Sequence, residues 1–287
     1  MKQDIYSKVT NQIIEQLENG SAPWLKPWQS SGTAATASMP HNAATGRAYS
    51  GINVMLLWAA PYATHGWLTY KQATALGGNV QRGQKGTHIV FWSQFEKKNA
   101  STDKMERFGF FKGYTVFNVD QCEGLTTAKL YDAPTSFDTT DTDAIHLASA
   151  NGATLQHGGD RAFFSPHHDL IQMPVQDAFD HINGYDATLL HELTHWSGSE
   201  KRLDRTLTGR FGDDAYAFEE LIAEIGSAFL CVQLGVTLAG LQHANYLATW
   251  LRVLKTDKRA IFTAASKAKQ ASEFLLTPLS DTVAVAA

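Results

Sequence analysis

The segment ATLLHELTHWSGS, residues 187–199, decides the character of the second half of this chain. His191 and His195 lie four residues apart, so on a helix their rings project from one face, one turn above the other. That spacing lets two imidazoles bind one metal ion at about 2.0–2.1 Å each. Glu192 is displaced around the helix, where it reaches a metal-bound water rather than the metal. The segment therefore predicts a helix-borne divalent metal site of the zinc-peptidase type, with Glu192 as its general base.

A third protein ligand is expected from a second apolar segment, AYAFEELIAEIGSAFL, residues 215–230. Glu220 and Glu224 lie four residues apart among apolar neighbours, where a carboxylate is costly to bury unless it is paired or binds metal. In zinc peptidases with a glutamate ligand, an acid four residues later often orients one of the histidines. We therefore favour Glu220 as the ligand and Glu224 as the orienting acid, and leave the reverse assignment open. Tyr216 and Tyr185 are further candidates, as hydrogen-bond donors to an oxyanion.

The donor set suits a small group of metals. Two imidazoles and a carboxylate fit Zn²⁺, and Mn²⁺ or another divalent ion fits as well. Three protein ligands leave one position open, which favours a catalytic over a structural metal and makes the chain a candidate zinc-dependent metallopeptidase. Two plainer interpretations stand beside this one: a structural metal, or a polar helix face whose glutamates pair with Arg or Lys.

Composition indicates a soluble globular protein of the cytoplasm. Apolar residues make up 44% of the 287 residues and charged residues 18%, which suffices for a packed core. No apolar run is long enough to span a membrane, and the N-terminal residues carry acids where a signal peptide needs an apolar stretch. Two distant cysteines match no ligand spacing and suit a reducing compartment.

The charge distribution divides the chain in two. Residues 1–130 hold 13 Lys+Arg against 8 Asp+Glu, and the remainder holds 11 against 20, which together give the net charge of −4. Such a change of sign suggests two units with different partners. The stretch 131–143, YDAPTSFDTTDTD, is rich in Asp, Thr and Ser and indicates a linker. We expect domains at 1–130 and 144–287.

The hydrophobic pattern predicts an α+β protein with a mixed first domain and a mainly helical second domain. In the first half, Ile5 to Leu17 have the spacing of an amphipathic helix that ends before Gly20, and Thr69 opens a short helix. Strands are expected after the basic turn at 81–87 and over 108–119. In the second half we expect helices at about 140–150, 186–197, 214–234, 241–255 and 258–275, short strands at 162–164 and 171–173, and a frayed C-terminus.

Five of the seven tryptophans fall within the first 92 residues, several beside cations. Binding of single-stranded DNA without sequence choice needs aromatic faces for the bases and cations for the phosphates. Tryptophans are more often part of a core, so composition permits a nucleic-acid partner without establishing one. The candidate DNA-binding residues are Trp24, Lys26, Trp28, Arg47, Tyr49, Trp67, Lys71, Arg82 and Lys85.

These motifs, taken together, resemble the ArdC-type antirestriction proteins of conjugative plasmids, whose N-terminal domain also occurs in TraC-type plasmid primases. The resemblance covers about residues 4 to 275. It departs from the family pattern in the turn QRGQKGT, where R-K-G-E-K-G-T is expected, so the phosphate contacts there are in doubt. The motifs that carry it are LENGSAPWLKPW, NAATGRAYSGIN, WLTYKQA, VQRGQKGT, HELTHWSG, EELIAEIGSAFL and YLATWLRVLKTDKRAIFTAASKAKQA.

The resemblance implies a first domain that binds single-stranded DNA and a second that is a zincin-like metallopeptidase domain. It places the metal on His191, His195 and one of the two glutamates, with Glu192 as general base. It implies protection of incoming plasmid DNA from restriction during conjugation. One alternative is a regulatory metallopeptidase that cleaves a host protein and uses its N-terminal domain for docking. Another is that DNA binding alone protects and the metal site has no catalytic role.

Overall fold

Two long helices, α5 (Ile182–Ser197) and α6 (Asp214–Leu234), pack against each other in the computed structural model. The two helices approach closely at Gly226 of α6, which has no side chain. A Cβ added there would lie 2.6 Å from the Thr194 side chain of α5. The Ser227 hydroxyl donates to the carbonyl of Ala187 across the same contact, at 3.1 Å. The structure describes residues 4–24, 38–62, 64–98, 105–126, 130, 143–205, 207, 213–236 and 246–286.

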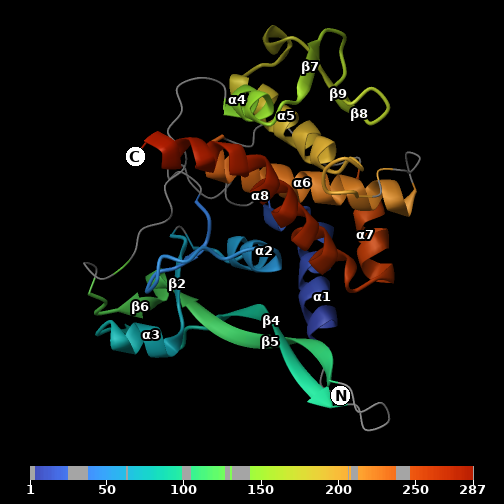
Figure 1. Ribbon diagram of the computed structural model, residues 1–287. Coiled ribbons are helices and arrows are strands. Elements are labelled where there is room, and N and C mark those ends of the chain that lie inside the picture. Colours follow the sequence, from blue (N-terminus) through green and yellow to red (C-terminus); the bar gives the residue numbers. More distant parts are fainter. Residues whose placement is uncertain are drawn as a thin grey trace.

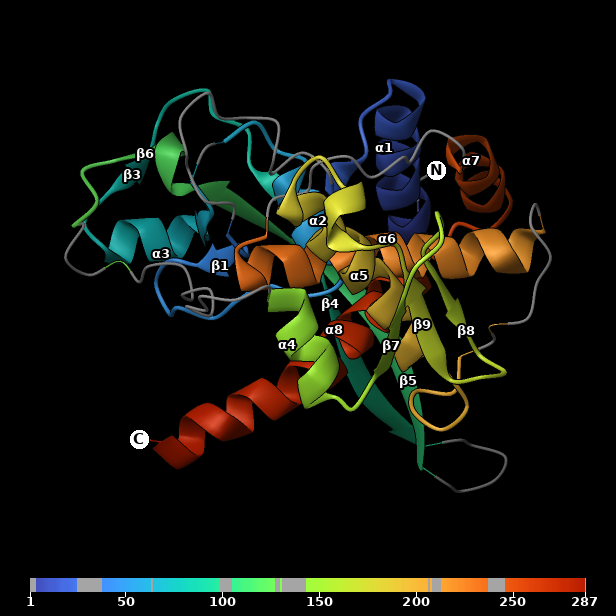
Figure 2. The same ribbon diagram turned by 90° about the horizontal axis from the view of Figure 1, so that it is seen from above.

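The last helix, α8 (Ala260–Ala286), runs along α6 and holds the helices of the second half together (Figures 1 and 2). It also contacts α5, α7 (Leu247–Thr256) and α4 (Asp143–Ala150), and it reaches α2 of the first half. The sequence predicts the four helices that begin at Asp143, Asp214, Leu247 and Ala260. The last of them is longer than the predicted range 258–275, because α8 continues to Ala286.

A small three-stranded sheet covers one side of α5. Its strands are β7 (Thr154–His157), β9 (Leu170–Met173) and β8 (Phe163–Ser165), in that order, with β7 parallel and β8 antiparallel to β9. The sequence predicts β8 and β9 but not β7. Because β9 is the central strand, β8 is an edge strand, and it lies against α5 (Figure 1).

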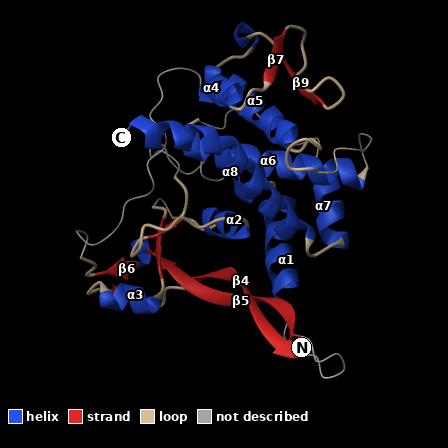
Figure 3. Cartoon of the chain, viewed as in Figure 1, coloured by secondary structure: helices blue, strands red, loops and turns tan. Residues whose placement is uncertain are grey.

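The first half contains a four-stranded sheet dominated by one long hairpin (Figure 3). Its strands, in spatial order, are β1 (His41–Asn42), β2 (Gly66–Leu68), β5 (Met105–Asn118) and β4 (Thr87–Lys98). Strands β4 and β5 pair along their whole length, with Trp92 opposite Phe111, and β4 is an edge strand. A separate two-stranded ladder joins β3 (Asn79–Val80) to β6 (Cys122–Glu123).

Three helices complete the first half: α1 (Ile5–Glu18), α2 (Ile52–Trp58) and α3 (Tyr70–Ala75). Thr69 caps α3 as predicted, because its hydroxyl accepts from the Gln72 backbone N–H and the Gln72 side chain reaches back to the Thr69 backbone. Every residue of α2 is buried, as its continuous apolar run requires. None of the helices that the structure describes is both long and apolar enough to cross a membrane.

The two halves share one hydrophobic core. Buried side chains of α1 and α2 pack in one cluster with those of α6, α7 and α8. Trp24, just after α1, meets Trp250 of α7 edge to face with ring centroids 5.7 Å apart. The predicted linker at 131–143 lies outside the described residues except for Asp143, which begins α4. The expected domain bounds therefore stay a prediction, but the structural contact between the halves is extensive.

Candidate functional site

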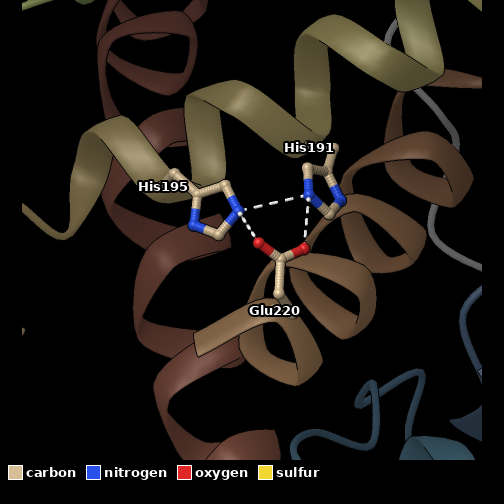
Figure 4. Close-up of side chains that lie close together, drawn as sticks. All are labelled: His191, His195 and Glu220. Atoms are coloured by element: carbon tan, nitrogen blue, oxygen red, sulfur yellow. Dashed lines mark hydrogen bonds and ion pairs between the residues drawn. The ribbon is translucent and has the colours of Figure 1, made fainter. Parts of the chain in front are cut away.

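Helices α5 and α6 bring three of the predicted ligands together (Figure 4). The two histidine Nε2 atoms lie 3.2 Å apart, and the Glu220 carboxylate faces both of them. Its Oε2 is 3.5 Å from His191 Nε2, and its Oε1 is 3.6 Å from His195 Nε2. Helical spacing aligns the two rings, and the close packing of α5 on α6 brings the carboxylate to them.

These distances fit one metal ion. Ligand atoms at about 2.0–2.1 Å from a tetrahedral ion lie about 3.4 Å from one another. The three separations observed here, 3.2, 3.5 and 3.6 Å, are close to that value. All three side chains are buried or nearly so. The donor set of two imidazoles and one carboxylate therefore suits a divalent ion with one position left for water or substrate.

Glu224 occupies a different place from Glu220. Its Oε1 lies 3.8 Å from Nδ1 of His191, on the side of the ring away from the Nε2 pair. The 3.8 Å separation is too long for a hydrogen bond, but the negative charge of Glu224 favours a proton on Nδ1, which leaves Nε2 free to donate to a metal. The geometry supports Glu220 as ligand and Glu224 as the orienting acid.

Glu219, which no motif in the sequence predicts as a site residue, lies beside the second histidine. Its Oε1 lies 3.4 Å from His195 Nδ1. The guanidinium of Arg205 donates to both Glu219 oxygens, at 2.8–3.2 Å, and also to Ser197 and to the carbonyl of Thr194. Because Arg205 is itself buried, this ion pair fixes the Glu219 carboxylate rigidly behind His195.

Electrostatics at the site favour a positive charge. Burial alone lowers the pKa of His191, but the hydrogen bond to Glu220 and the charges of Glu224 and Glu192 outweigh it and raise that pKa to about 9. Burial raises the pKa of Glu220, and the two histidines outweigh it and lower that pKa to about 2. The Glu220 carboxylate therefore stays ionised and contributes the negative charge that a divalent cation requires.

Glu192 lies in a cleft of about 650 Å³ beside the two histidines. Its Oε2 accepts a hydrogen bond from the backbone N–H of Phe164 in β8, at 2.8 Å. The side chain is buried, and the bond orients its carboxylate within the cleft. Edge strand β8 thus forms one wall of the cleft.

The two tyrosines named as oxyanion donors have different environments. Tyr216 lines the cleft, and its hydroxyl lies 3.4 Å from that of Tyr246, which also lines it. Burial raises the pKa of Tyr216, so its hydroxyl keeps its proton and can donate it in a hydrogen bond. Tyr185 is fully buried in the core around α4 and α5, where its hydroxyl is 2.8 Å from His157 Nε2. The oxyanion hypothesis is therefore wrong for Tyr185.

Several predicted DNA-binding aromatics are core residues. The rings of Trp24 and Trp67 are 0% and 1% exposed, and Tyr49 is 8% exposed. Trp24 and Trp67 cannot offer a ring face to a base, because each is packed against other apolar side chains, whereas Tyr49 also lines a cleft between the two halves of the chain. A stacking role is therefore wrong for Trp24 and Trp67, and a DNA contact of Tyr49 stays a prediction. Lys26 and Trp28 lie outside the described residues.

The predicted cations of the first half are at the surface. Arg47, Lys71, Arg82 and Lys85 are all exposed. Arg47 belongs to the turn before α2, whereas Lys71 is in α3 and the other two lie in the turn between β3 and β4. The exposed aromatic residues that the structure describes in this half are Tyr70 in α3 and, on the long hairpin, Phe91, Trp92, Phe110 and Tyr114. The sequence pattern of a strand does not show which of its aromatic residues are exposed, so these residues could not be distinguished from core aromatics before the structure was known.

Known proteins match this chain in sequence and fold over nearly its whole length. A crystal structure of the antirestriction ArdC protein from plasmid R388, metal-free, matches with a TM-score of 0.82 and 40% identity over 97% of this chain and 99% of that chain. The family described as the N-terminal domain of anti-restriction factor ArdC matches residues 3–117. The chain belongs to the ArdC antirestriction family. A zincin-like metallopeptidase family matches residues 142–267, which implies a divalent metal, and the Mn(II)-bound structure of R388 ArdC matches with a TM-score of 0.79.

Two curated relatives extend the comparison. The uncharacterized protein y4eC of Sinorhizobium fredii is 40% identical over 97% of this chain and 93% of its own length. DNA primase TraC of Escherichia coli is 38% identical over 96% of this ArdC family member, which spans 27% of that primase. The motif resemblance implies that only the N-terminal domain is shared with TraC. The similarity is more extensive than that, because it includes the metal-site helices.

Proposed function

We propose that this ArdC family member binds single-stranded DNA and protects incoming plasmid DNA from restriction during conjugation. The observation that carries the proposal is the full-length match to R388 ArdC in both sequence and fold. The match to a DNA primase over nearly the whole chain and the cationic, aromatic surface of the first half support a DNA partner. We expect the protein to act in the cytoplasm, where incoming DNA encounters restriction enzymes.

We infer that the second half holds a divalent metal ion on His191, His195 and Glu220 and hydrolyses peptide bonds. A bound divalent ion would act as a Lewis acid, making a water molecule more acidic and polarising a substrate carbonyl. Glu192 takes the proton of that water and passes it to the leaving amine. Tyr216 donates a hydrogen bond to the oxygen that gains charge. Zn²⁺ suits the donors, and Mn²⁺ is the ion named for the R388 relative.

The substrate of the metal site is proposed to be an extended protein segment. Edge strand β8 borders the cleft, and an extended peptide can add to such an edge through main-chain hydrogen bonds. A peptide so placed runs past Glu192, which bonds to the backbone of Phe164 in that strand. The alternative of a regulatory metallopeptidase without a DNA role has no observation that favours it over protection.

A conjugation assay tests the proposal. Transfer of a plasmid with restriction sites into restricting and non-restricting recipients is compared with and without the gene. The wild-type gene is expected to raise transfer only into the restricting recipient, and equal transfer with and without the gene contradicts the proposal.

Glu192→Gln separates catalysis from binding in the same assay. The amide keeps the shape of the side chain but cannot accept the proton, so hydrolysis is expected to be lost while metal and DNA binding persist. Metal content and oligonucleotide affinity of the purified variant serve as controls. Full protection by this variant would show that hydrolysis is not how protection works.

A further inference from the structure

A second large cleft, of about 1050 Å³, lies where the two halves of the chain meet. We call it the basic cleft. One wall is the segment before α2 together with the first two residues of that helix, at residues 42–53, and the opposite wall is the face of α8 from Arg259 to Lys269. Between them runs the free edge of β4 at Val90–Trp92, where the Asn53 side chain bonds to both backbone groups of Val90 at 2.7 and 2.9 Å. The basic cleft is thus open along β4 beyond Val90.

The charge of the basic cleft has one sign. Four cations line it, one from the turn and three from α8 and its start, and none of the described lining residues is acidic. Among the described residues, no ion pair joins Arg47 or Lys267 to an acid, whereas Lys269 pairs with Glu273 at 3.4 Å. A concave surface lined by cations alone attracts a polyanion. The cations are Arg47, Arg259, Lys267 and Lys269.

Helical spacing on α8 arranges these groups in a row. Arg259, Thr263, Ser266 and Lys267 recur at intervals that put them on one face of the helix. The opposite side of α8 is apolar and packs in the shared core, with Ala264 and Ala268 fully buried. The row of cations and hydroxyls therefore faces the basic cleft and not the core.

The aromatic ring of Trp92 also lines the basic cleft. Trp92 is 54% exposed, although it is held edge to face by Phe111 with ring centroids 5.1 Å apart. Its ring lies directly over Gly109, where an added Cβ would come within 1.9 Å of it. A ring that is fixed by its neighbours and still half-exposed can stack on a base without loss of side-chain entropy.

We propose that the basic cleft binds a short stretch of single-stranded nucleic acid, with phosphates on Arg47, Arg259 and Lys267 and a base on Trp92. The inference rests on the proposed DNA-binding function and goes further, because it assigns two of the phosphate contacts to the second half of the chain. Only an unpaired base can present its face to Trp92, which selects a single strand over a duplex. A volume near the upper end of pockets for small ligands, about 300–1000 Å³, suits a few nucleotides of a longer strand.

The test uses the full-length protein and fluorescence anisotropy with labelled oligothymidylate at several salt concentrations. Arg259→Gln/Lys267→Gln is expected to weaken binding at least tenfold at low salt. Loss of two phosphate contacts should flatten the slope of log K against log salt by about 1.4, at about 0.7 per contact on single strands. Lys267→Gln alone is compared with Lys201→Gln, which removes the same charge from an exposed residue after α5 and is expected to leave binding unchanged.

Trp92 is tested separately. Trp92→Ala should weaken binding at least about fivefold, whereas Trp92→Phe keeps a ring and should remain near wild type. Thermal unfolding of each variant checks that it is folded. Strong binding by the wild type with no loss in the cleft variants would overturn the cleft and leave DNA binding standing. Equal affinity of the wild type for a duplex would overturn the choice of a single strand, and no binding at all would overturn both proposals.

Discussion

The metal cleft and the basic cleft are opposites in charge, burial and origin. The four glutamates of the metal cleft come from two neighbouring helices and are buried, and each faces a histidine, an arginine or a backbone N–H. The cations of the basic cleft come from segments more than two hundred residues apart, and their partners in the described chain are few. The metal cleft depends on the packing of two helices, whereas the basic cleft depends on surface charge. We therefore expect the two clefts to respond differently to mutation and to salt.

The largest effect is expected from removing a metal ligand. His195→Ala takes away one of three protein donors, so metal retained after dialysis should fall to background by elemental analysis. Affinity for single-stranded DNA should not change, because the ring is not in the basic cleft. His167→Ala, in the exposed turn between β8 and β9, is the matched control and should retain metal. A parallel loss of DNA affinity in His195→Ala would break the comparison by coupling the two clefts.

The next effect is expected from the buried ion pair behind the metal site. Arg205→Ala leaves the Glu219 carboxylate buried without its bidentate partner, which should cost about 3–5 kcal/mol in free energy of unfolding. Denaturant titration measures the loss.

The control for that pair is an exposed one. Arg252→Ala breaks the pair with Asp214, in which both side chains are more than half-exposed, and should cost less than about 1 kcal/mol. Similar losses for the two variants would show that burial does not set the worth of these pairs.

A third prediction concerns the contact that brings Glu220 to the histidines. Gly226→Ala introduces a Cβ that would lie 2.6 Å from Thr194 Cγ2, so α5 and α6 must separate. Overpacking of this kind costs about 1–3 kcal/mol and should also lower metal affinity, measured by calorimetry. Thr194→Ser removes the clashing methyl group, so the double variant should recover part of both losses. No loss of metal affinity in Gly226→Ala would show that the helix spacing is not critical.

The smallest effect concerns Asp186 on α5, which forms no ion pair with any residue that the structure describes. Burial, and then the charge of Asp143, raises the pKa of Asp186 to about 6. A raised folded-state pKa stabilises the fold below the unfolded value near 4, and that stability is lost as pH rises through about 6. Asp186→Asn should therefore unfold at a higher temperature than wild type at pH 7.5, by about 1–2 kcal/mol in stability, with the difference shrinking towards pH 5. A constant difference across this range would rule out the titration of Asp186.

The helices of the second half could be predicted from sequence because their signals are local. Helix α6 has the predicted bounds, and Gly235 ends it with a positive φ of 72°. The pairing of His191 with His195 likewise needs only one helical turn. The position of Glu220 between them follows from the register of α6 on α5, which the motifs suggested and the structure resolves.

Features that depend on contacts between distant segments could not be predicted in the same way. Arg205 reaches Glu219 only because the chain after α5 folds back, with the Arg205 backbone N–H bonded to the carbonyl of Gly198. Burial of Trp24 and Trp67 and exposure of Trp92 are properties of the assembled structure, because each depends on which distant segments pack over the ring. The basic cleft exists only once α8 lies beside the β4 edge.

The core that α1 and α2 share with α6, α7 and α8 has a consequence for how such genes recombine. A crossover that transferred only the first half would deliver half a core, with Leu17 and Trp24 stripped of the helices that cover them. The shared core stays intact only when both halves are transferred together, and the segment of the much longer primase that matches spans 96% of this chain. Shuffling is expected to spare the boundary between the halves even where it joins new domains outside them.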